Sequence, residues 1–265
     1  MKVGLFTGNQ PRHLSLAAKL AEVVDSVHVV QECVTVFPGQ VDDFYKKTAV
    51  MQDYFRRVLE AERSVFGKIG FLPANVHQLA LRVGDVSMVD LDILAPVLSS
   101  DIIVVFGASW IRSPLIEKLV ERNTINIHMG LSPWYRGSSC NFWALYDGHP
   151  EMVGATIHRL SRGLDSGPML FHALPRPAPV DAFLLGMRAV QAAHQGLVTH
   201  IADGSLLHLP CQKQDPSLEV RYTRNAHFTD EAAQDYLENR RPTPEQVLAA
   251  TQARDLSRFL NPFIP

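Results

Sequence analysis

The first 31 residues contain a strand, a helix and a second strand, and this order restricts the fold more than any other feature of the sequence. Lys2 to Thr7 is a short apolar run that ends at a Gly-Asn turn, residues 13–24 carry apolar side chains at helical spacing, and Ser26 to Gln31 is rich in valine. Two strands joined by a helix within about thirty residues form a βαβ unit, whose strands are parallel neighbours in one sheet. The sequence therefore predicts an α/β fold.

The same alternation continues along the chain. The clearest buried strand is expected at residues 101–107, and a long amphipathic helix is expected at Val41 to Phe66. Further strands are expected at residues 79–83, 124–128, 154–158 and 169–174, and further helices at residues 89–98, 114–122 and 181–202, with two modest ones that begin at Thr229 and Thr243. We expect a catalytic domain over residues 1–204 and a small C-terminal extension over residues 205–265.

Composition and charge exclude several classes of protein. Apolar residues make up 46% of the chain and the net charge is −2 with both signs mixed, so we expect an ordinary globular protein without a nucleic-acid partner. Three cysteines without a CxxC pair argue against a disulfide framework or a structural zinc site. The N-terminus lacks the regions of a signal peptide, and no apolar run reaches the roughly 18 residues of a membrane span. We therefore expect a cytoplasmic protein that has no membrane partner.

Common catalytic and nucleotide-binding motifs are absent. No GxGxxG follows the first strand, so the dinucleotide-binding fingerprint is missing, and Gly8 with Asn9 makes only a weak glycine turn. The sequence also contains no Walker motif, no HExxH and no GxSxG. The chemistry must therefore come from other polar residues.

Asn126 and His128 are the first such residues. They are two positions apart on a predicted strand, so their side chains share one face, close to the carboxyl edge where open α/β sheets bind ligands. A histidine there can act as a general acid or base near neutral pH, and an asparagine amide can donate to an oxygen on which charge develops. The two residues taken alone fit equally a strand end that polar side chains cap.

Two predicted loops follow this strand. Residues 131–137 are punctuated by proline and glycine and place Arg136 beside Trp134 and Tyr135. Residues 163–168 place Asp165 between two glycines, which by itself is more often a turn than a site. The combination of strand and loops within 42 residues is more informative than any one of them.

In this combination the sequence resembles the folate-dependent formyltransferases, and among them most of all the sugar N-formyltransferases. The family pattern of N-x-H, P-x-Y-R-G, G-x-T-x-H and D-x-G-P appears at residues 126–128, 133–137, 154–158 and 165–168. The resemblance covers about Val104 to Leu174. It implies a Rossmann-like formyltransferase fold with a mainly parallel, twisted sheet flanked by helices.

The resemblance also implies a reaction. An N-formyltransferase of this kind moves the formyl group of 10-formyltetrahydrofolate to a primary amine, without a metal. Asn126 and His128 would stabilise the oxyanion, His128 would also carry the proton that leaves the amine, and Asp165 would orient His128 and raise its pKa.

Binding residues are implied in the same way. The folate would be bound by two loops that contain Trp110, Ile111, Arg112, Leu160, Ser161 and Gly163. The acceptor would be bound by Gly8, Asn9, Arg12, Trp134, Tyr135 and Arg136. Phe142, Trp143 and Tyr146 fit either a stacking surface for the acceptor or the aromatic, core-facing side of a helix.

The acceptor is less well defined. Gly130 and Ser132 stand where the family usually has Ser and Leu, in the stretch expected near the acceptor amine. The chain length fits best a small-molecule amine, namely the 4-amino group of a nucleotide-linked dideoxy sugar. Alternatives are an acceptor of the phosphoribosylglycinamide or hydroxyornithine type, or a hydrolase that passes the formyl group to water. A tRNA acceptor ranks lower because the roughly sixty residues after the long helix are not basic. The apolar residues near the C-terminus cover the core or join a partner subunit, and a homodimer is the expected oligomer.

Overall fold

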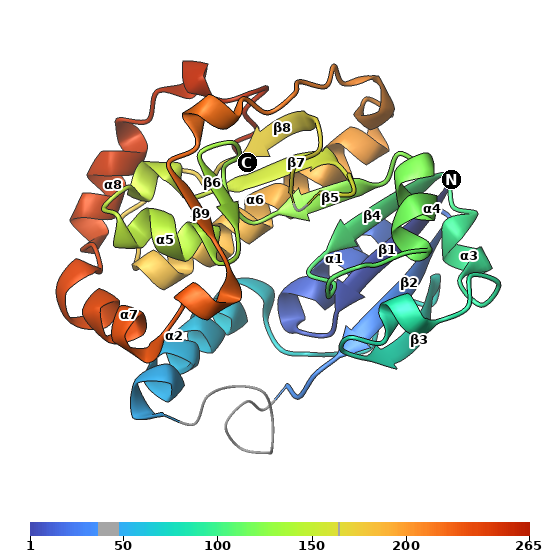
Figure 1. The fold of residues 1–265 in the computed structure, drawn as a ribbon, viewed down its shortest axis with the longest axis horizontal. Coiled ribbons are helices and arrows are strands. Elements are labelled where there is room, and N and C mark those ends of the chain that lie inside the picture. The colour runs from blue at the N-terminus through green and yellow to red at the C-terminus, as the bar shows by residue number, and fades with distance from the viewer. Residues whose placement is uncertain (37–47, 164) are drawn as a thin grey trace.

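The structure, a computed structural model, describes residues 1–36, 48–163 and 165–265. Its centre is a seven-stranded sheet in the order β3-β2-β1-β4-β5-β7-β8, as Figure 1 shows. Strands β3, β2, β1, β4 and β5 are parallel to one another, whereas the β5–β7 and β7–β8 pairs are antiparallel. The predicted α/β fold with a mainly parallel sheet is confirmed.

The strands of this sheet are β1 (Lys2–Gly8), β2 (Ser26–Cys33), β3 (Val76–Arg82), β4 (Ile102–Phe106), β5 (Ile125–His128), β7 (Ala155–Arg159) and β8 (Met169–Ala173). The helices are α1 (Pro11–Ala21), α2 (Ala49–Phe66), α3 (Ala95–Leu98), α4 (Leu115–Glu121), α5 (Cys140–Tyr146), α6 (Ala182–Ala202), α7 (Asp230–Asp235) and α8 (Pro244–Gln252). A second, two-stranded sheet pairs β6 (Tyr135–Gly137) with β9 (Arg221–Thr223).

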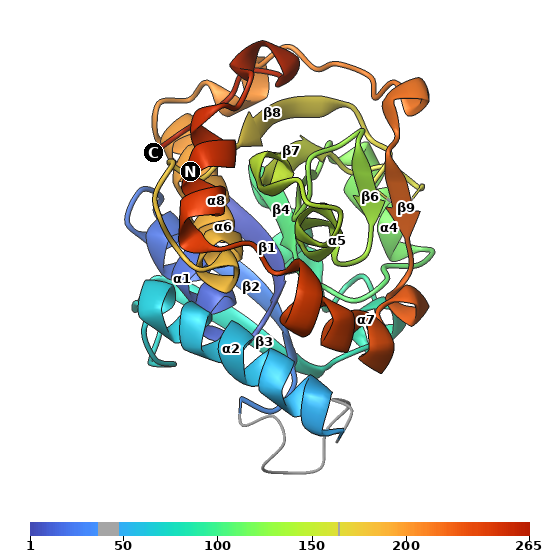
Figure 2. The same ribbon diagram turned by 90° about the vertical axis from the view of Figure 1, so that its left-hand side faces the viewer.

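Helices cover both faces of the large sheet. Leu5 and Phe6 are neighbours on β1 and point to opposite faces, and both are fully buried. Leu5 belongs to the apolar cluster that contains Leu16 of α1 and Leu197 of α6, and Phe6 to the cluster that contains Leu119 of α4. Figure 2 shows α1, α2 and α6 together on one side of the sheet. Each such buried side chain stabilises the fold by about 1.5–3 kcal/mol, which is why the strands of this sheet are nearly continuous apolar runs.

Two predicted elements differ from the structure. Residues 89–98 are not one helix, because only Ala95–Leu98 is helical. The carbonyl of Asp90 accepts turn hydrogen bonds from Ile93 and Leu94, and Pro96 lies in the first turn of the short helix, where proline is tolerated. The helix expected from Val41 begins at Ala49, and residues 41–47 lie outside the described residues.

The predicted loop at residues 131–137 is also partly wrong, since it contains strand β6. This strand exists because β9, more than eighty residues later, pairs with it in parallel. Gly137 has a positive φ of 90°, and a Cβ at this position would overlap the carbonyl oxygen of Thr223. The close approach of the two backbones therefore requires glycine.

Residues 205–265 pack on the rest of the chain. Beyond the β6–β9 pair, Phe263 exchanges backbone hydrogen bonds with His172 and Leu174 at β8. Tyr236 and Phe259 are buried in an apolar cluster with α5 and α6, so part of this segment covers the core. The division of the chain at residue 204 and the homodimer both stay predictions.

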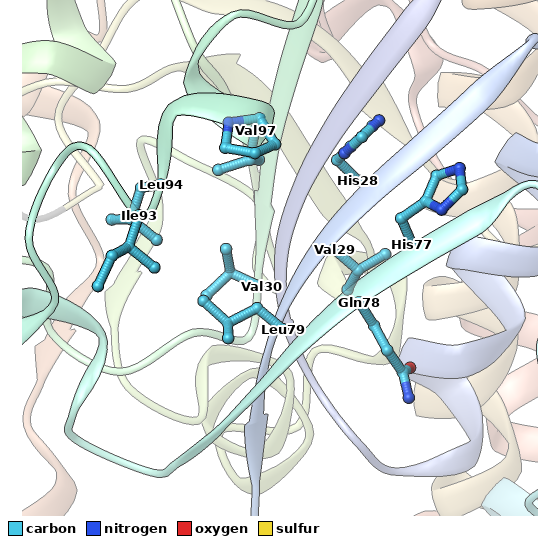
Figure 3. A pocket seen from close by; sticks show the side chains of 10 residues that line it. His28, Val29, Val30, His77, Gln78, Leu79, Ile93, Leu94 and Val97 are labelled. Carbon is cyan, nitrogen blue, oxygen red and sulfur yellow. The ribbon is translucent and has the colours of Figure 1, made fainter.

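Two further findings concern the described residues only. None of their helices combines the length and the apolar character needed to cross a bilayer. A cavity of about 330 Å³, shown in Figure 3, lies at the edge strand β3 and is lined mainly by apolar residues of β2, β3 and residues 93–97. None of the predicted site residues lines it.

Candidate active site

Strands β5 and β7 place three polar side chains beside one another. Asn126 and His128 lie on β5, and the antiparallel register pairs Asn126 with His158 of β7. The loop that follows β7 brings Asp165 back to the same place, and this residue has a positive φ of 45°. Such a backbone conformation is costly for a residue other than glycine, and it is typical of a functional loop that the surrounding structure holds in place.

Asp165 is the hub of a buried hydrogen-bond network. Its Oδ2 lies 3.2 Å from Nδ1 of His128, and its Oδ1 accepts a hydrogen bond of 3.2 Å from Nδ2 of Asn126. The same amide nitrogen is 2.9 Å from Nε2 of His158, whose Nδ1 is 2.8 Å from the carbonyl oxygen of Arg159. Since a carbonyl can only accept, Nδ1 of His158 carries the hydrogen and Nε2 accepts from Asn126.

The pair of His128 and Asp165 is an ion pair. Burial by itself lowers the pKa of His128, but the nearby Asp165 carboxylate and a contact with Cys140 outweigh it, and the pKa of His128 is well above its usual range. Burial by itself raises the pKa of Asp165, but the charge of His128 and its hydrogen bond outweigh burial and hold the pKa of this carboxyl below its usual range. Nε2 of His128 lies 3.3 Å from the carbonyl oxygen of Tyr135, so the protonated ring donates from both nitrogens.

A cavity of about 350 Å³ opens onto this network. Asn126 and Asp165 line it, whereas His128 lies behind them and is 6% exposed. The other lining residues are Val105, Ala108, Ser109, Trp110, Ile111, Ile116, Ser138, Leu160, Ser161, Arg162, Gly163 and Asn225. The size is within the range of small-molecule sites.

Most of the predicted folate residues meet in this cavity. Trp110, Ile111, Leu160, Ser161 and Gly163 line it, and Leu164, next in the chain, lies outside the described residues. Arg112 is not among the lining residues, and its backbone N–H donates to Ser87 Oγ.

The predicted acceptor residues near the first strand have partners of their own. Asn9 exchanges two hydrogen bonds with the backbone of Val34 and so ties the ends of β1 and β2 together. Arg12 forms an ion pair of 2.7 Å with the buried Glu62. A Cβ at Gly8 would overlap the ring of His13. None of the three predicted residues lines the cavity at Asn126.

The predicted acceptor residues after β5 are packed as well. Trp134 is 7% exposed and contacts the rings of His172 and Phe259. Tyr135 is buried, and Arg136 forms an ion pair of 2.9 Å with Glu219. The side chains at 142, 143 and 146 lie on α5 in an aromatic cluster, as the packing alternative expects. The structure thus brings the catalytic and folate residues together, and not the acceptor residues.

Several residues of this region were not among the predicted site residues, and His158, Ser138 and Asn225 are three polar ones. His158 carried a signal, because the family pattern G-x-T-x-H contains it. Ser138 and Asn225 carried none: Ser138 follows the YRG motif as an ordinary loop residue, and Asn225 comes from the C-terminal segment that β9 holds against β6.

Gly130 lies too close to Cys140 and His128 to carry a side chain. A Cβ at Gly130 would overlap the Cβ of Cys140 and would also lie 2.7 Å from Nε2 of His128. Cys140 is buried, and its thiol donates to the carbonyl oxygen of Gly137. In this structure, Cys140 and the ring of His128 therefore leave no room for the side chain of a serine at position 130.

Comparisons with known proteins agree with this geometry. A family model described as formyl transferase matches residues 89–201. The curated methionyl-tRNA formyltransferase of Agathobacter rectalis is 36% identical over 136 residues, which are 50% of this chain and 44% of that protein. The chain thus spans less than half the length of the curated relatives it matches.

Two solved structures share the fold. A sugar N-formyltransferase from Shewanella has a TM-score of 0.50 at 20% identity and covers 86% of this chain and 78% of its own. An N-formyltransferase from Helicobacter canadensis, solved with folinic acid and dTDP-3-aminofucose, has a TM-score of 0.50 at 13% identity and covers 86% and 73%. At these identities the likeness establishes the fold alone.

Proposed function

We propose that the chain is a member of the formyltransferase family, whose model matches residues 89–201, and that it transfers the formyl group of 10-formyltetrahydrofolate to a primary amine. One observation carries this proposal: five of the six residues expected to bind folate line the same cavity as Asn126 and Asp165. The exposed indole of Trp110 and the apolar side chains of Ile111 and Leu160 suit a flat bicyclic ring, and Asn126 and Asp165 of the polar network border the same cavity.

10-Formyltetrahydrofolate supplies an activated formyl group when bound. Asn126 donates to the formyl oxygen as negative charge develops there, by exchanging its hydrogen bond to Asp165 for one to that oxygen. His128, fixed as a cation behind the cavity wall, stabilises the same charge through the electrostatic field. Both groups act best on the oxyanion, which is how a site lowers the barrier rather than only binding its ligands.

Asp165 lines the cavity and His128 does not, so Asp165 relays the proton that the attacking amine loses and, because its pKa is held low, carries this proton only transiently. It then returns this proton to the leaving nitrogen of the folate, so that charge balances over the reaction. His158 holds the amide of Asn126 in one orientation by accepting from its Nδ2. This assignment moves the proton transfer from His128, where the sequence pattern placed it, to Asp165.

For the acceptor we propose an amine on a nucleotide-linked dideoxy sugar. The cavity is also lined by Ser138 and Asn225, an uncharged hydroxyl and an amide that suit sugar hydroxyl groups. The Helicobacter canadensis neighbour was solved with dTDP-3-aminofucose, an acceptor of this class.

The test is a mass-spectrometric assay with 10-formyltetrahydrofolate and separate acceptors. The panel contains nucleotide-linked 3-amino and 4-amino dideoxy sugars, phosphoribosylglycinamide, hydroxyornithine and methionyl-tRNA, plus a reaction without any acceptor. We expect the formyl mass on an amino sugar. Formylated tRNA would show that the proposed acceptor is wrong and that the acceptor is a tRNA. Folate turnover without an amine would show that the protein is a hydrolase and not a transferase. The absence of folate turnover in every reaction would refute the proposed function.

A matched pair of histidine variants tests the site itself. His128→Ala should lose activity by about 100- to 1000-fold, as removal of one oxyanion-stabilising group does. His149→Ala is the control, because this histidine is half exposed and its ring pairs with Glu151 at the surface. Similar turnover in both variants would contradict the assignment.

A further inference from the structure

Glu32, at the end of β2, is a buried carboxylate held by three uncharged donors. It is 3% exposed. Its Oε2 accepts from the backbone N–H of Ser109 at 2.6 Å, and its Oε1 accepts from the hydroxyl of Ser109 at 2.8 Å and the N–H of Gly84 at 2.7 Å. Burying a carboxylate is costly, and these bonds compensate for the lost water.

Two of the three bonds, those to Ser109, join the ends of strands that are not neighbours, whereas Gly84 follows the neighbouring strand β3. In the sheet order β3-β2-β1-β4, β1 separates β2 from β4, and Glu32 reaches past it to the loop that follows β4. The next residues of this loop are tied to the same side of the molecule, since Arg112 N–H donates to Ser87 Oγ at 2.9 Å. The backbone from Ser109 to Arg112 is therefore anchored from outside the cavity.

In dinucleotide-binding folds, an acidic residue near this position, about 20 residues after the glycine-rich turn, binds a ribose hydroxyl. Here the glycine-rich fingerprint is absent and both oxygens of Glu32 are already engaged by Ser109 and Gly84. The Glu32 carboxylate therefore accepts hydrogen bonds from loops of the protein and not from a ligand.

We propose that Glu32 is a positioning residue that holds the wall formed by Ala108, Ser109, Trp110 and Ile111 in the geometry that binds folate. This inference rests on the proposed function, because that wall is the proposed folate site. Ser109, Trp110 and Ile111 are consecutive and all line the cavity, so a shift of Ser109 moves the other two.

The experiment measures binding of folinic acid through tryptophan fluorescence. Trp110 is 57% exposed and lines the cavity, whereas Trp134 and Trp143 are buried, so the ligand-dependent change reports on Trp110. Glu32→Gln replaces one acceptor oxygen by an NH₂ group that faces a donor. We expect the Kd for folinic acid and the KM for 10-formyltetrahydrofolate to rise about tenfold. The kcat at saturating folate and the KM for the acceptor should stay within about twofold of wild type, a split that general destabilisation does not produce.

Glu60→Gln is the control, because Glu60 lies exposed on α2 and pairs with Arg56. If Glu32→Gln does not fold, Glu32→Asp keeps the charge but is one methylene too short to reach both Ser109 and Gly84, and it should show the same selective rise. Unchanged folate binding in the folded variant would overturn this inference. Failure of the wild-type protein to bind folinic acid at all would instead overturn the proposed function.

Discussion

The ion pair between Asp165 and His128 makes the most demanding prediction, through the variant Asp165→Asn. The substitution keeps the size of the side chain and removes its charge. At the observed 3.2 Å, two unit charges attract one another by about 5 kcal/mol at an effective dielectric constant of about 20. Without this attraction, burial favours the neutral form of His128, so the positive charge behind the cavity wall is lost and no carboxylate remains to accept the proton.

Loss of general-base and electrostatic functions together should lower kcat by about 1000-fold, which is about 4 kcal/mol of activation free energy. The KM for 10-formyltetrahydrofolate should change far less, since Trp110, Ile111 and Leu160 are untouched. The assay is steady-state release of tetrahydrofolate with the identified acceptor. Asp53→Asn is the control, because Asp53 lies on the exposed face of α2 and pairs with Arg56 and Arg57. A kcat within tenfold of wild type would refute the proposed roles.

The same variant changes how stability depends on pH. The lowered pKa of Asp165 stabilises the fold above about pH 4, and this contribution is lost as the pH falls through the folded pKa. The raised pKa of His128 stabilises the fold below about pH 6.5, and this contribution is lost as the pH rises through the folded pKa. Urea unfolding should therefore show the largest deficit of Asp165→Asn between about pH 4 and 6.5 and a smaller one in alkaline solution. A deficit that keeps growing as the pH rises above about 6.5 would contradict the ion pair.

Three further predictions concern the surroundings of the site. Gly130→Ser should lower the free energy of unfolding by about 1–3 kcal/mol, because its Cβ would overlap the Cβ of Cys140. Adding Cys140→Gly, which removes that Cβ, should restore part of the loss in thermal unfolding, and an unchanged Tm in the single variant would argue against the overlap. Gly137→Ala should separate β6 from β9 and expose the segment after Thr223 to proteases, whereas a wild-type digestion pattern would show that the pairing tolerates a Cβ. Asn225→Ala should raise the KM for the acceptor about tenfold and leave the KM for folate unchanged, and the reverse pattern in initial-rate kinetics would assign Asn225 to the folate side.

Local patterns in the sequence were sufficient to predict much of the fold and to select the residues that we propose to react. Buried parallel strands are short apolar runs, and strand alternation alone places Asn126 and His128 on one face. The helix predicted at residues 89–98 was wrong for a local reason as well, because the aspartates of this segment and Pro96 favour turns over a continuous helix. The identity of residues 126, 128 and 165 follows from the motif, whereas their distances do not.

Only the tertiary structure decided which polar residues are free to meet a ligand. Asn9, Arg12 and Trp134 look available in the sequence, but each has a partner inside the protein. Glu32 and Asn225 show no local signal, because their roles depend on loops 77 residues and about 60 residues away in the chain. A sequence pattern predicts the local secondary structure around each residue, and not the distant residues that it contacts. The partners of a buried carboxylate, and the wall of a cavity, are set by segments that meet only when the chain has folded.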